Sequence, residues 1–155
     1  MPHATIDWLL EEVLDMAAAG LVPAVTLLVG GTLVAGTPVS EMAYFEGVGA
    51  SLAEALAAHG QAETADGLSE MYREYGRAAE DDRKRRRDRA HTLAERARDD
   101  LHEGEALSQE TPPEVARVYV LLKDATIHGP GGERFEAPFW RGRLAEVDGW
   151  SFGRP

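Results

Sequence analysis

The sequence predicts an α+β fold: a small bent antiparallel sheet or SH3/Sm-like barrel, with an N-terminal helix and a long helical insertion. Two blocks of short, β-branched apolar segments, residues 22–39 and 115–153, indicate strands and form the predicted β-core. A run with helical periodicity lies between them, so residues 40–110 form the predicted insertion. Because two strands alone make no stable sheet, both blocks must share one. The 155 residues fit a single domain spanning 1–155.

The first element is an amphipathic helix. Its apolar residues have the i, i+3, i+4, i+7 spacing of one helix face: Ile6, Leu9, Leu10, Val13, Leu14 and Ala17. Thr5 is placed to cap the start of this helix, and Gly20 to end it. A strand pair follows, in which Gly30-Gly31 forms a two-residue turn. Gly36, inside the second strand, predicts a bulge or a sharp bend.

The insertion is predicted to be helical. Ser40 is expected to cap a helix that ends before a polar, turn-rich spacer at residues 60–67. From residue 68 to about residue 102 the pattern predicts one long helix, whose apolar stripe is interrupted by Asp82 and Arg86. A stripe broken in this way favours a helix that projects from the β-core and pairs with a second copy. The self-association candidates are Leu68, Met71, Tyr72, Tyr75, Leu93 and Leu101.

The C-terminal block contains the remaining strands. Residues 116–129 alternate between two faces and predict a strand, and the glycine-rich segment 129–133 predicts a turn. Residues 138–147, "PFWRGRLAEV", predict another strand. Asp148-Gly149 is a hairpin signal, so this strand is expected to turn back into the final "WSFG".

Composition excludes several kinds of site. The chain has no cysteine, which excludes disulfides and thiolate zinc sites. The N-terminal segment lacks the basic region of a signal peptide, and Pro23 and Gly30-Gly31 interrupt the longest apolar run, so neither secretion nor a membrane span is expected. The net charge is −11 and no segment is strongly basic, which disfavours nucleic-acid binding. We therefore expect a cytoplasmic protein.

Two charged groups in the long helix have simple structural interpretations. His91, Glu95, Asp99 and His102 share one side of the helix, as metal ligands in helical bundles do, but that side is opposite the apolar stripe. The tract "RKRRR", residues 83–87, has acidic residues on both sides that pair with it at i, i+4 spacing. No complete catalytic motif is present either. We predict no metal site, no cofactor and no enzymatic activity.

The stretch "FWRGRLAEVDGWSFG", residues 139–153, has two interpretations. It is either a core hairpin with arginine stems packed along the sheet, or a partner surface, because exposed aromatic and arginine side chains are typical of binding hot spots. The partner-binding candidates are Trp140, Arg141, Arg143, Glu146, Asp148 and Trp150.

The same stretch resembles the C-terminal signature of the gas vesicle accessory protein U family, in which an F-W-R-G-basic-aliphatic-A-E-V-D-G run precedes an aromatic strand. A second segment, "VTLLVGGTLVAGTPVSEMAYFE", is similar to that family's strand, turn, glycine-containing strand and serine-capped helix start. The segment "VYVLLKDATIH" resembles a third family strand more loosely. Together these segments cover about half of the chain.

The resemblance implies a cytoplasmic, non-enzymatic protein that acts in the assembly or clustering of gas vesicles. The expected partners are the vesicle shell protein or other accessory proteins, together with further copies of the chain, since a homo-oligomer is expected. The alternative is an Sm-like or SH3-like small barrel that binds RNA through residues 83–89, with an affinity that falls steeply as salt rises.

Overall fold

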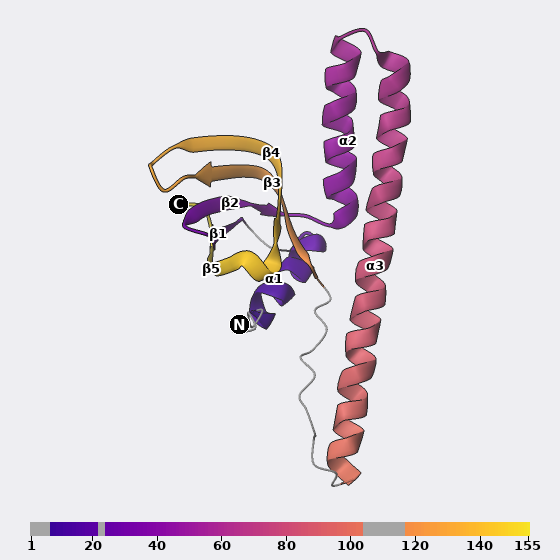
Figure 1. Cartoon of the computed structure of the whole chain (residues 1–155), viewed down its shortest axis with the longest axis vertical. Coiled ribbons are helices and arrows are strands. Elements are labelled where there is room, and N and C mark those ends of the chain that lie inside the picture. The colour runs from indigo at the N-terminus through magenta and orange to yellow at the C-terminus, as the bar shows by residue number, and fades with distance from the viewer. Residues whose placement is uncertain (1–6, 22–23, 104–116) are drawn as a thin grey trace.

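A computed structural model describes residues 7–21, 24–103 and 117–155 of the chain (Figure 1). These residues form three helices and a five-stranded antiparallel open sheet. The elements, in chain order, are α1 (Trp8–Ala18), β1 (Val25–Val29), β2 (Thr32–Pro38), α2 (Glu41–Ala58), α3 (Ala62–Glu103), β3 (Tyr119–His128), β4 (Arg134–Arg143), a 3-10 helix (Leu144–Glu146) and β5 (Val147–Phe152). The predicted α+β fold is confirmed.

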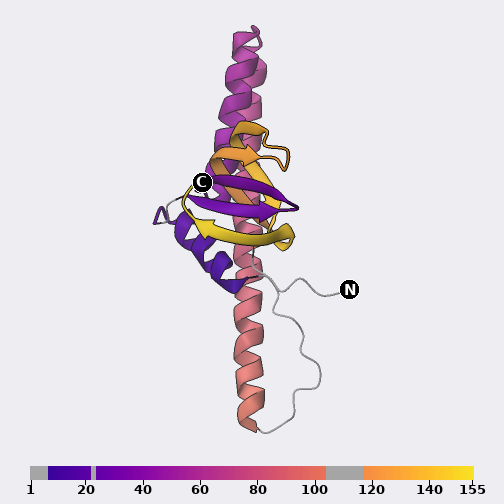
Figure 2. The ribbon, with the colours of Figure 1, turned by 90° about the vertical axis from the view of Figure 1, so that its left-hand side faces the viewer.

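The sheet has the strand order β4-β3-β2-β1-β5, so strands from both ends of the sequence lie side by side. In the described part of the chain, β4 pairs only with β3 and β5 only with β1. The sheet therefore has two edges, and of the two predicted architectures the bent open sheet is the one found. Figure 2 shows the strands as a single layer in front of the long helix α3.

Three glycine predictions of the N-terminal half are confirmed. Gly30 and Gly31 both have positive φ, 55° and 81°, as a tight two-residue hairpin turn requires. Gly20 also has positive φ and follows the end of α1. At Gly36 the β2–β3 register shifts, and a Cβ there would lie 2.9 Å from the Cβ of Leu122. Gly36 thus lets two strands approach closely where the sheet bends.

The apolar core lies between α1 and one face of the sheet. Its most deeply buried side chains are Leu10, Val13, Leu14, Val25, Leu27, Val34, Val120 and Leu122. Of the predicted stripe, Leu10, Val13, Leu14 and Ala17 are buried as expected, whereas Leu9 is 43% exposed and Ile6 lies outside the described residues. The predicted cap, Thr5, lies outside the described residues, and the N-cap observed is Asp7, whose Oδ1 accepts from the backbone N–H groups of Leu9 and Leu10.

The helices α2 and α3 form an antiparallel hairpin beside the sheet (Figure 1). Ser40 caps α2 as predicted, its Oγ accepting from the backbone N–H of Ala43. The predicted spacer at residues 60–67 is wrong, because α3 already begins at Ala62 and the turn is confined to His59–Gln61. A single helical glycine such as Gly67 costs only about 1 kcal/mol, which packing against α2 offsets.

The predicted C-terminal hairpin is also wrong. The strand β4 ends at Arg143, and β5 pairs with β1 at the other edge of the sheet. Leu144, in the 3-10 helix between them, is buried in the core, which turns the chain away from β4. Asp148-Gly149 consequently lies inside β5, where Asp148 Oδ2 accepts from the backbone N–H of Gly30 at 2.9 Å.

Candidate functional site

Four charged side chains join the helical hairpin to the rest of the molecule, and we call them the ion-pair cluster: Asp15, Glu41, Arg83 and Arg117. They come from α1, α2, α3 and the residue that leads into β3. Arg117 contacts Asp15 at 2.9 Å and Glu41 at 3.4 Å, and Arg83 contacts the same two carboxylates at 3.2 and 3.1 Å. Two positive charges thus face two negative charges.

The cluster is largely withdrawn from water. Only 2% of the Arg117 side chain and 11% of the Glu41 side chain are exposed. Glu11, on the same flank of α1, adds a contact by accepting the backbone N–H of Arg117 at 2.9 Å. Buried charges are costly unless they are paired, so this pairing fixes where the hairpin sits relative to the sheet.

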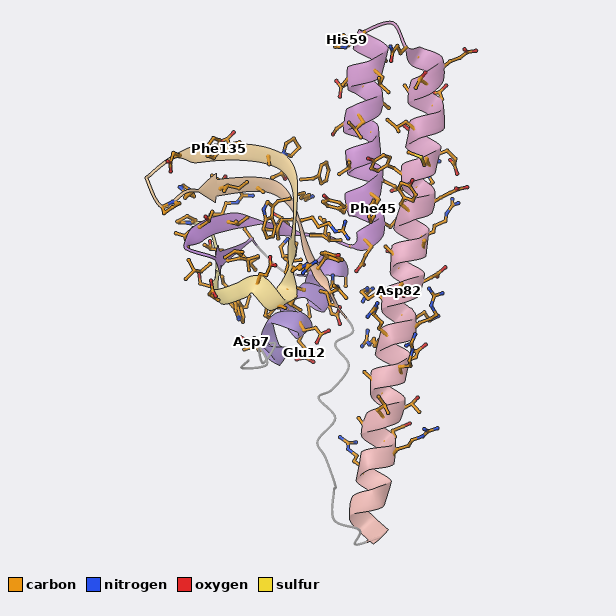
Figure 3. All side chains as sticks on the ribbon, in the orientation of Figure 1. Asp7, Glu12, Phe45, His59, Asp82 and Phe135 are labelled. Carbon is orange, nitrogen blue, oxygen red and sulfur yellow. The ribbon has the colours of Figure 1, made fainter. Side chains whose placement is uncertain are left out.

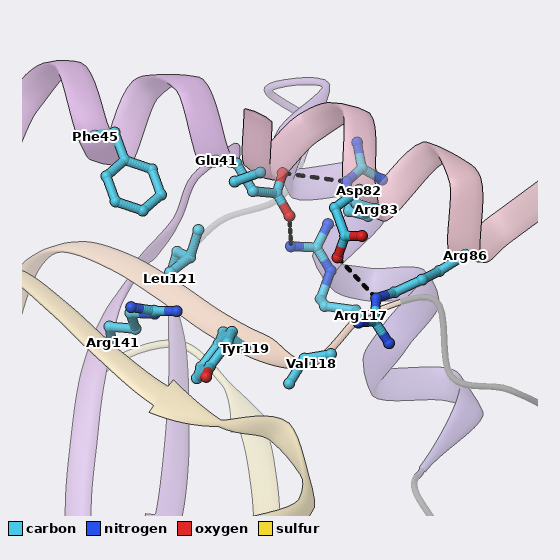
Figure 4. A pocket seen from close by; sticks show the side chains of 11 residues that line it. Glu41, Phe45, Asp82, Arg83, Arg86, Arg117, Val118, Tyr119, Leu121 and Arg141 are labelled. Atoms are coloured by element: carbon cyan, nitrogen blue, oxygen red, sulfur yellow. Dashed lines mark hydrogen bonds and ion pairs between the residues drawn. The ribbon is translucent and has the colours of Figure 1, made fainter. Parts of the chain in front are cut away.

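A cleft of about 270 Å³ opens beside the ion-pair cluster (Figure 4). One wall is α3, through Ala79, Asp82, Arg83 and Arg86, and the opposite wall is the start of β3, through Arg117, Val118, Tyr119 and Leu121. Glu41 and Phe45 of α2 and Arg141 of β4 complete it. In the wall formed by α3, Arg86 Nε donates to Asp82 at 2.8 Å, and this hydrogen bond lowers the pKa of Asp82.

Arg141 is held over an aromatic ring at the cleft. Its guanidinium carbon lies 3.7 Å from the centroid of the Tyr119 ring, which is a cation–π geometry. Tyr44 lies near enough for Arg141 to act on its charge, although burial raises the pKa of Tyr44 by more than Arg141 lowers it. Within the described residues, Arg141 has no acidic partner.

The neighbours of Arg141 in β4 explain the pattern "FWRG". Phe139 packs against α2 at Gly47, where a Cβ would lie 2.0 Å from the ring. Trp140 packs against the core, and its indole lies across Gly142, where a Cβ would lie 2.2 Å from the ring. Phe139 thus contacts the helical hairpin, Arg141 lines the cleft beside it, and Trp140 faces the core. This stretch therefore contributes both to the core and to the exposed surface.

The partner-binding candidates do not form one surface. Trp140 and Trp150 are half-buried against the core, and Trp150 Nε1 donates to Asp7 Oδ2 at 2.7 Å. Asp148 binds the turn at Gly30. Arg141, Arg143 and Glu146 are exposed, and of the six candidates Arg141 lines the cleft.

The self-association candidates divide into two groups. Leu68 and Tyr72 are half-buried, and Tyr72 packs on Gly49 of α2, so this part of the stripe serves the hairpin itself. Met71 and Tyr75 remain partly exposed beside it, and Tyr75 joins an aromatic cluster with Phe45. Leu93 is 47% exposed on the part of α3 that extends beyond α2, below Asp82 in Figure 3. The side chain of Leu101 lies outside the described residues.

The two charged groups of the long helix that the sequence singled out, the His and acidic residues at 91–102 and the tract 83–87, both lie on α3. His91 Nδ1 lies 3.5 Å from Glu95, on an exposed face of α3. Among the residues that the structure describes, no three His, Asp or Glu side chains are grouped to hold a metal ion. In the tract 83–87, Arg83 belongs to the ion-pair cluster, and Arg85 and Arg86 contact Asp82. No helix in the described part of the chain has the length and apolarity needed to cross a bilayer.

Sequence reasoning did not identify Asp15, Glu41 or Arg117 as a group. Asp15 lies off the apolar stripe of the first helix, where an acid facing solvent is expected, and 102 residues separate it from Arg117. The available signal was Arg117 itself, a charge directly before the alternating apolar segment of β3. A charge there needs a partner, but the sequence does not say which one.

A comparison with protein families gives a match over residues 7–93 to the family described as gas vesicle protein GvpU-like. Comparisons with curated proteins and with solved structures give no match. The matched segment is more than half of the chain and runs from the N-cap of α1 into α3, so it contains three members of the ion-pair cluster. Arg117 and the stretch 139–153 lie outside it. The chain belongs to the GvpU-like gas vesicle protein family.

Proposed function

We propose that this chain is a non-enzymatic accessory protein that acts in the assembly or clustering of gas vesicles, through self-association and binding to the shell protein. The observation that carries the proposal is the family match over residues 7–93, which includes most of the long helix α3. The proposal places the protein in the cytoplasm or at the vesicle surface. It treats residues 22–39 and 115–153 as one β-core and residues 40–110 as its insertion.

The chemistry of the cleft supports a binding role over catalysis. Four of the residues that line the cleft are arginines: Arg83, Arg86, Arg117 and Arg141. The arginines of the cleft provide charge and hydrogen bonds, which suit recognition of another protein.

Self-association is assigned to the part of α3 beyond α2. The 42 residues of α3 span about 63 Å at 1.5 Å per residue, whereas α2 has 18 residues. Among the described side chains of this extension, Leu93 is an exposed leucine. Substitution of Leu93 by Glu should therefore lower the oligomer mass measured by light scattering without changing the fold.

A matched control is Ala94→Glu, which adds the same charge to an exposed neighbour about 100° around the helix. If both variants lower the oligomer mass equally, added negative charge is the cause and the assignment to the Leu93 face is wrong. If neither variant changes it, association does not use this part of α3.

Binding to the vesicle is tested by co-flotation. Purified protein is mixed with stripped gas vesicles, and the floating layer is assayed for wild type, Arg141→Ala and Arg143→Ala. Wild type should float, and loss of Arg141, which lines the cleft, should reduce the bound fraction more than loss of Arg143. If wild type stays in solution, direct binding to the vesicle shell is wrong.

A further inference from the structure

Among the described residues that line the cleft, Arg141 differs from the other three arginines in having no carboxylate in contact. Arg83 and Arg117 are matched by Asp15 and Glu41 within the ion-pair cluster. Arg86 is matched by Asp82. Arg141 lines the same cleft and, within the described residues, has no carboxylate in contact. Within the described residues, one arginine of the cleft thus has no carboxylate in contact, in a chain whose net charge is −11.

Arg141 is already oriented. Its guanidinium carbon lies 3.7 Å from the centroid of the half-buried Tyr119 ring, while the side chain as a whole stays exposed. Residues 121 and 141 are paired in the β3–β4 register, so the strand pair fixes the position of the arginine backbone as well. A guanidinium is planar and offers two parallel N–H groups to a carboxylate, and contact with the ring restricts its position before it binds.

The remaining walls of the cleft are mostly apolar. Phe45, Ala79 and Leu121 line it, and Val118 is 39% exposed at the same site. A volume of about 270 Å³ is slightly below the usual range of small-molecule sites, which begins at about 300 Å³. The cleft therefore suits one or two apolar side chains rather than a cofactor.

We propose that this cleft binds a peptide segment of a partner protein, and that the segment is apolar apart from one acidic side chain. Arg141 donates two parallel hydrogen bonds to the carboxylate of that side chain, in a bidentate interaction. A single arginine without a carboxylate in contact fits a carboxylate better than a phosphate group, which carries about two negative charges and calls for more donors. The proposal rests on the proposed function, because it gives the chemistry by which a vesicle protein would be recognised.

The test uses two capped peptides, acetyl-Leu-Glu-Leu-amide and acetyl-Leu-Gln-Leu-amide, titrated into the isotope-labelled full chain. Binding is followed by the NMR shifts of the Val118 and Tyr119 amides and of the Arg141 side-chain Nε. We expect the Glu peptide to bind with a Kd on the order of 1 mM and at least about tenfold more tightly than the Gln peptide. A third peptide, acetyl-Leu-Gln-Leu with a free C-terminus, should bind no better than its amide.

Substitutions of arginine test whether Arg141 is the residue that makes the Glu peptide bind more tightly than the Gln peptide. Arg141→Gln should abolish this preference, and Arg141→Lys should keep only part of it, because an ammonium lacks the planar pair of donors. Arg134→Gln, an exposed arginine on the same strand, should keep it in full. Equal binding of the Glu and Gln peptides to wild type, or no shift at Val118 and Tyr119 with up to about 10 mM peptide, would overturn the proposal.

The two proposals fail separately. If the peptides behave as expected but the protein does not co-float with vesicles, the cleft binds acidic peptides and direct binding to the vesicle shell is wrong. If the protein co-floats but does not prefer the Glu peptide, the vesicle role stands and the assignment of the cleft is wrong. Preference for the peptide with a free C-terminus would also overturn the choice of an internal acidic side chain.

Discussion

The helix α1 makes two different contacts, one on each side. Its apolar face, with Leu10, Val13 and Leu14, packs on the sheet and is almost completely buried. Its acidic flank, with Glu11 and Asp15, meets Arg117 and, through Asp15, Arg83 of α3. The first contact depends on area and shape, and many apolar residues could make it. The second depends on which charges meet, and its two arginines, Arg83 and Arg117, line the cleft.

The largest expected effect lies in the ion-pair cluster. Arg117→Met keeps most of the side-chain volume but leaves Asp15 and the buried Glu41 with Arg83 as their remaining cation. Removing one partner from a buried ion pair typically costs about 3–5 kcal/mol, and we expect a loss near the lower end because Arg83 stays. Urea unfolding, followed by circular dichroism, measures the change.

The matched control for Arg117→Met is Arg143→Met, at an exposed position outside the ion-pair cluster. This control should change the free energy of unfolding by less than about 0.5 kcal/mol. If Arg117→Met costs no more than Arg143→Met, the hairpin is held to the sheet by its apolar contacts alone. The contrast between the two sides of α1 would then be wrong.

The apolar face of α1 gives the next effect. Leu10 is 1% exposed, and Leu10→Ala should lower the free energy of unfolding by about 2–4 kcal/mol through lost burial and the cavity left behind. The neighbouring Leu9 is 43% exposed, so Leu9→Ala should cost less than about 1 kcal/mol. Equal losses for the two variants in urea unfolding would contradict the placement of α1 on the sheet.

These contacts also separate what the sequence could and could not predict. The apolar stripe of α1 follows from spacing alone, since a helix that repeats every 3.6 residues brings Leu10, Val13 and Leu14 to one face. Gly30-Gly31 and Gly36 were predictable for a similar reason, because turns and close approaches of backbone demand glycine. In each case the cause lies within a few neighbouring residues.

The polar contacts and the C-terminal strand pairing have distant causes. Asp15 has the same local pattern as any solvent-facing acid, and its pairing with Arg117 depends on how four elements meet. The local signal Asp148-Gly149 predicted a hairpin, but burial of Leu144 and pairing of β5 with β1 decide the path of the chain. Arg141 was a candidate from its residue type, whereas its stacking on Tyr119 depends on the β3–β4 register.

A third test examines the contact between the hairpin and β4. Alanine normally stabilises a helix by about 1 kcal/mol relative to glycine. At Gly47, however, the added Cβ would lie 2.0 Å from the Phe139 ring, so Gly47→Ala should instead cost about 1–3 kcal/mol. In a Phe139→Ala background the same substitution should become neutral or stabilising. If Gly47→Ala has the same effect with and without the Phe139 ring, α2 does not pack on Phe139 at this position, and the described contact between the helical hairpin and β4 is wrong.

The smallest effect is a pH dependence at the start of α1. The hydrogen bond from Trp150 to Asp7, together with those from the Leu9 and Leu10 backbone, lowers the pKa of Asp7 although partial desolvation opposes it. A carboxyl group whose pKa is lower in the folded state stabilises the fold above its ordinary pKa of about 3.9 and loses that effect as the pH falls through the lower folded value. Asp7→Asn removes this titration but retains a capping oxygen.

Stability against urea should therefore fall less steeply for Asp7→Asn than for wild type between about pH 5 and pH 2. The difference should be smaller than in the other tests, because Asp7 is exposed and its interactions are screened by water. Tryptophan fluorescence is a suitable readout, since Trp150 makes the hydrogen bond. Parallel pH curves for the two proteins would mean that the negative charge of Asp7 does not contribute to stability, which would contradict the lowered pKa.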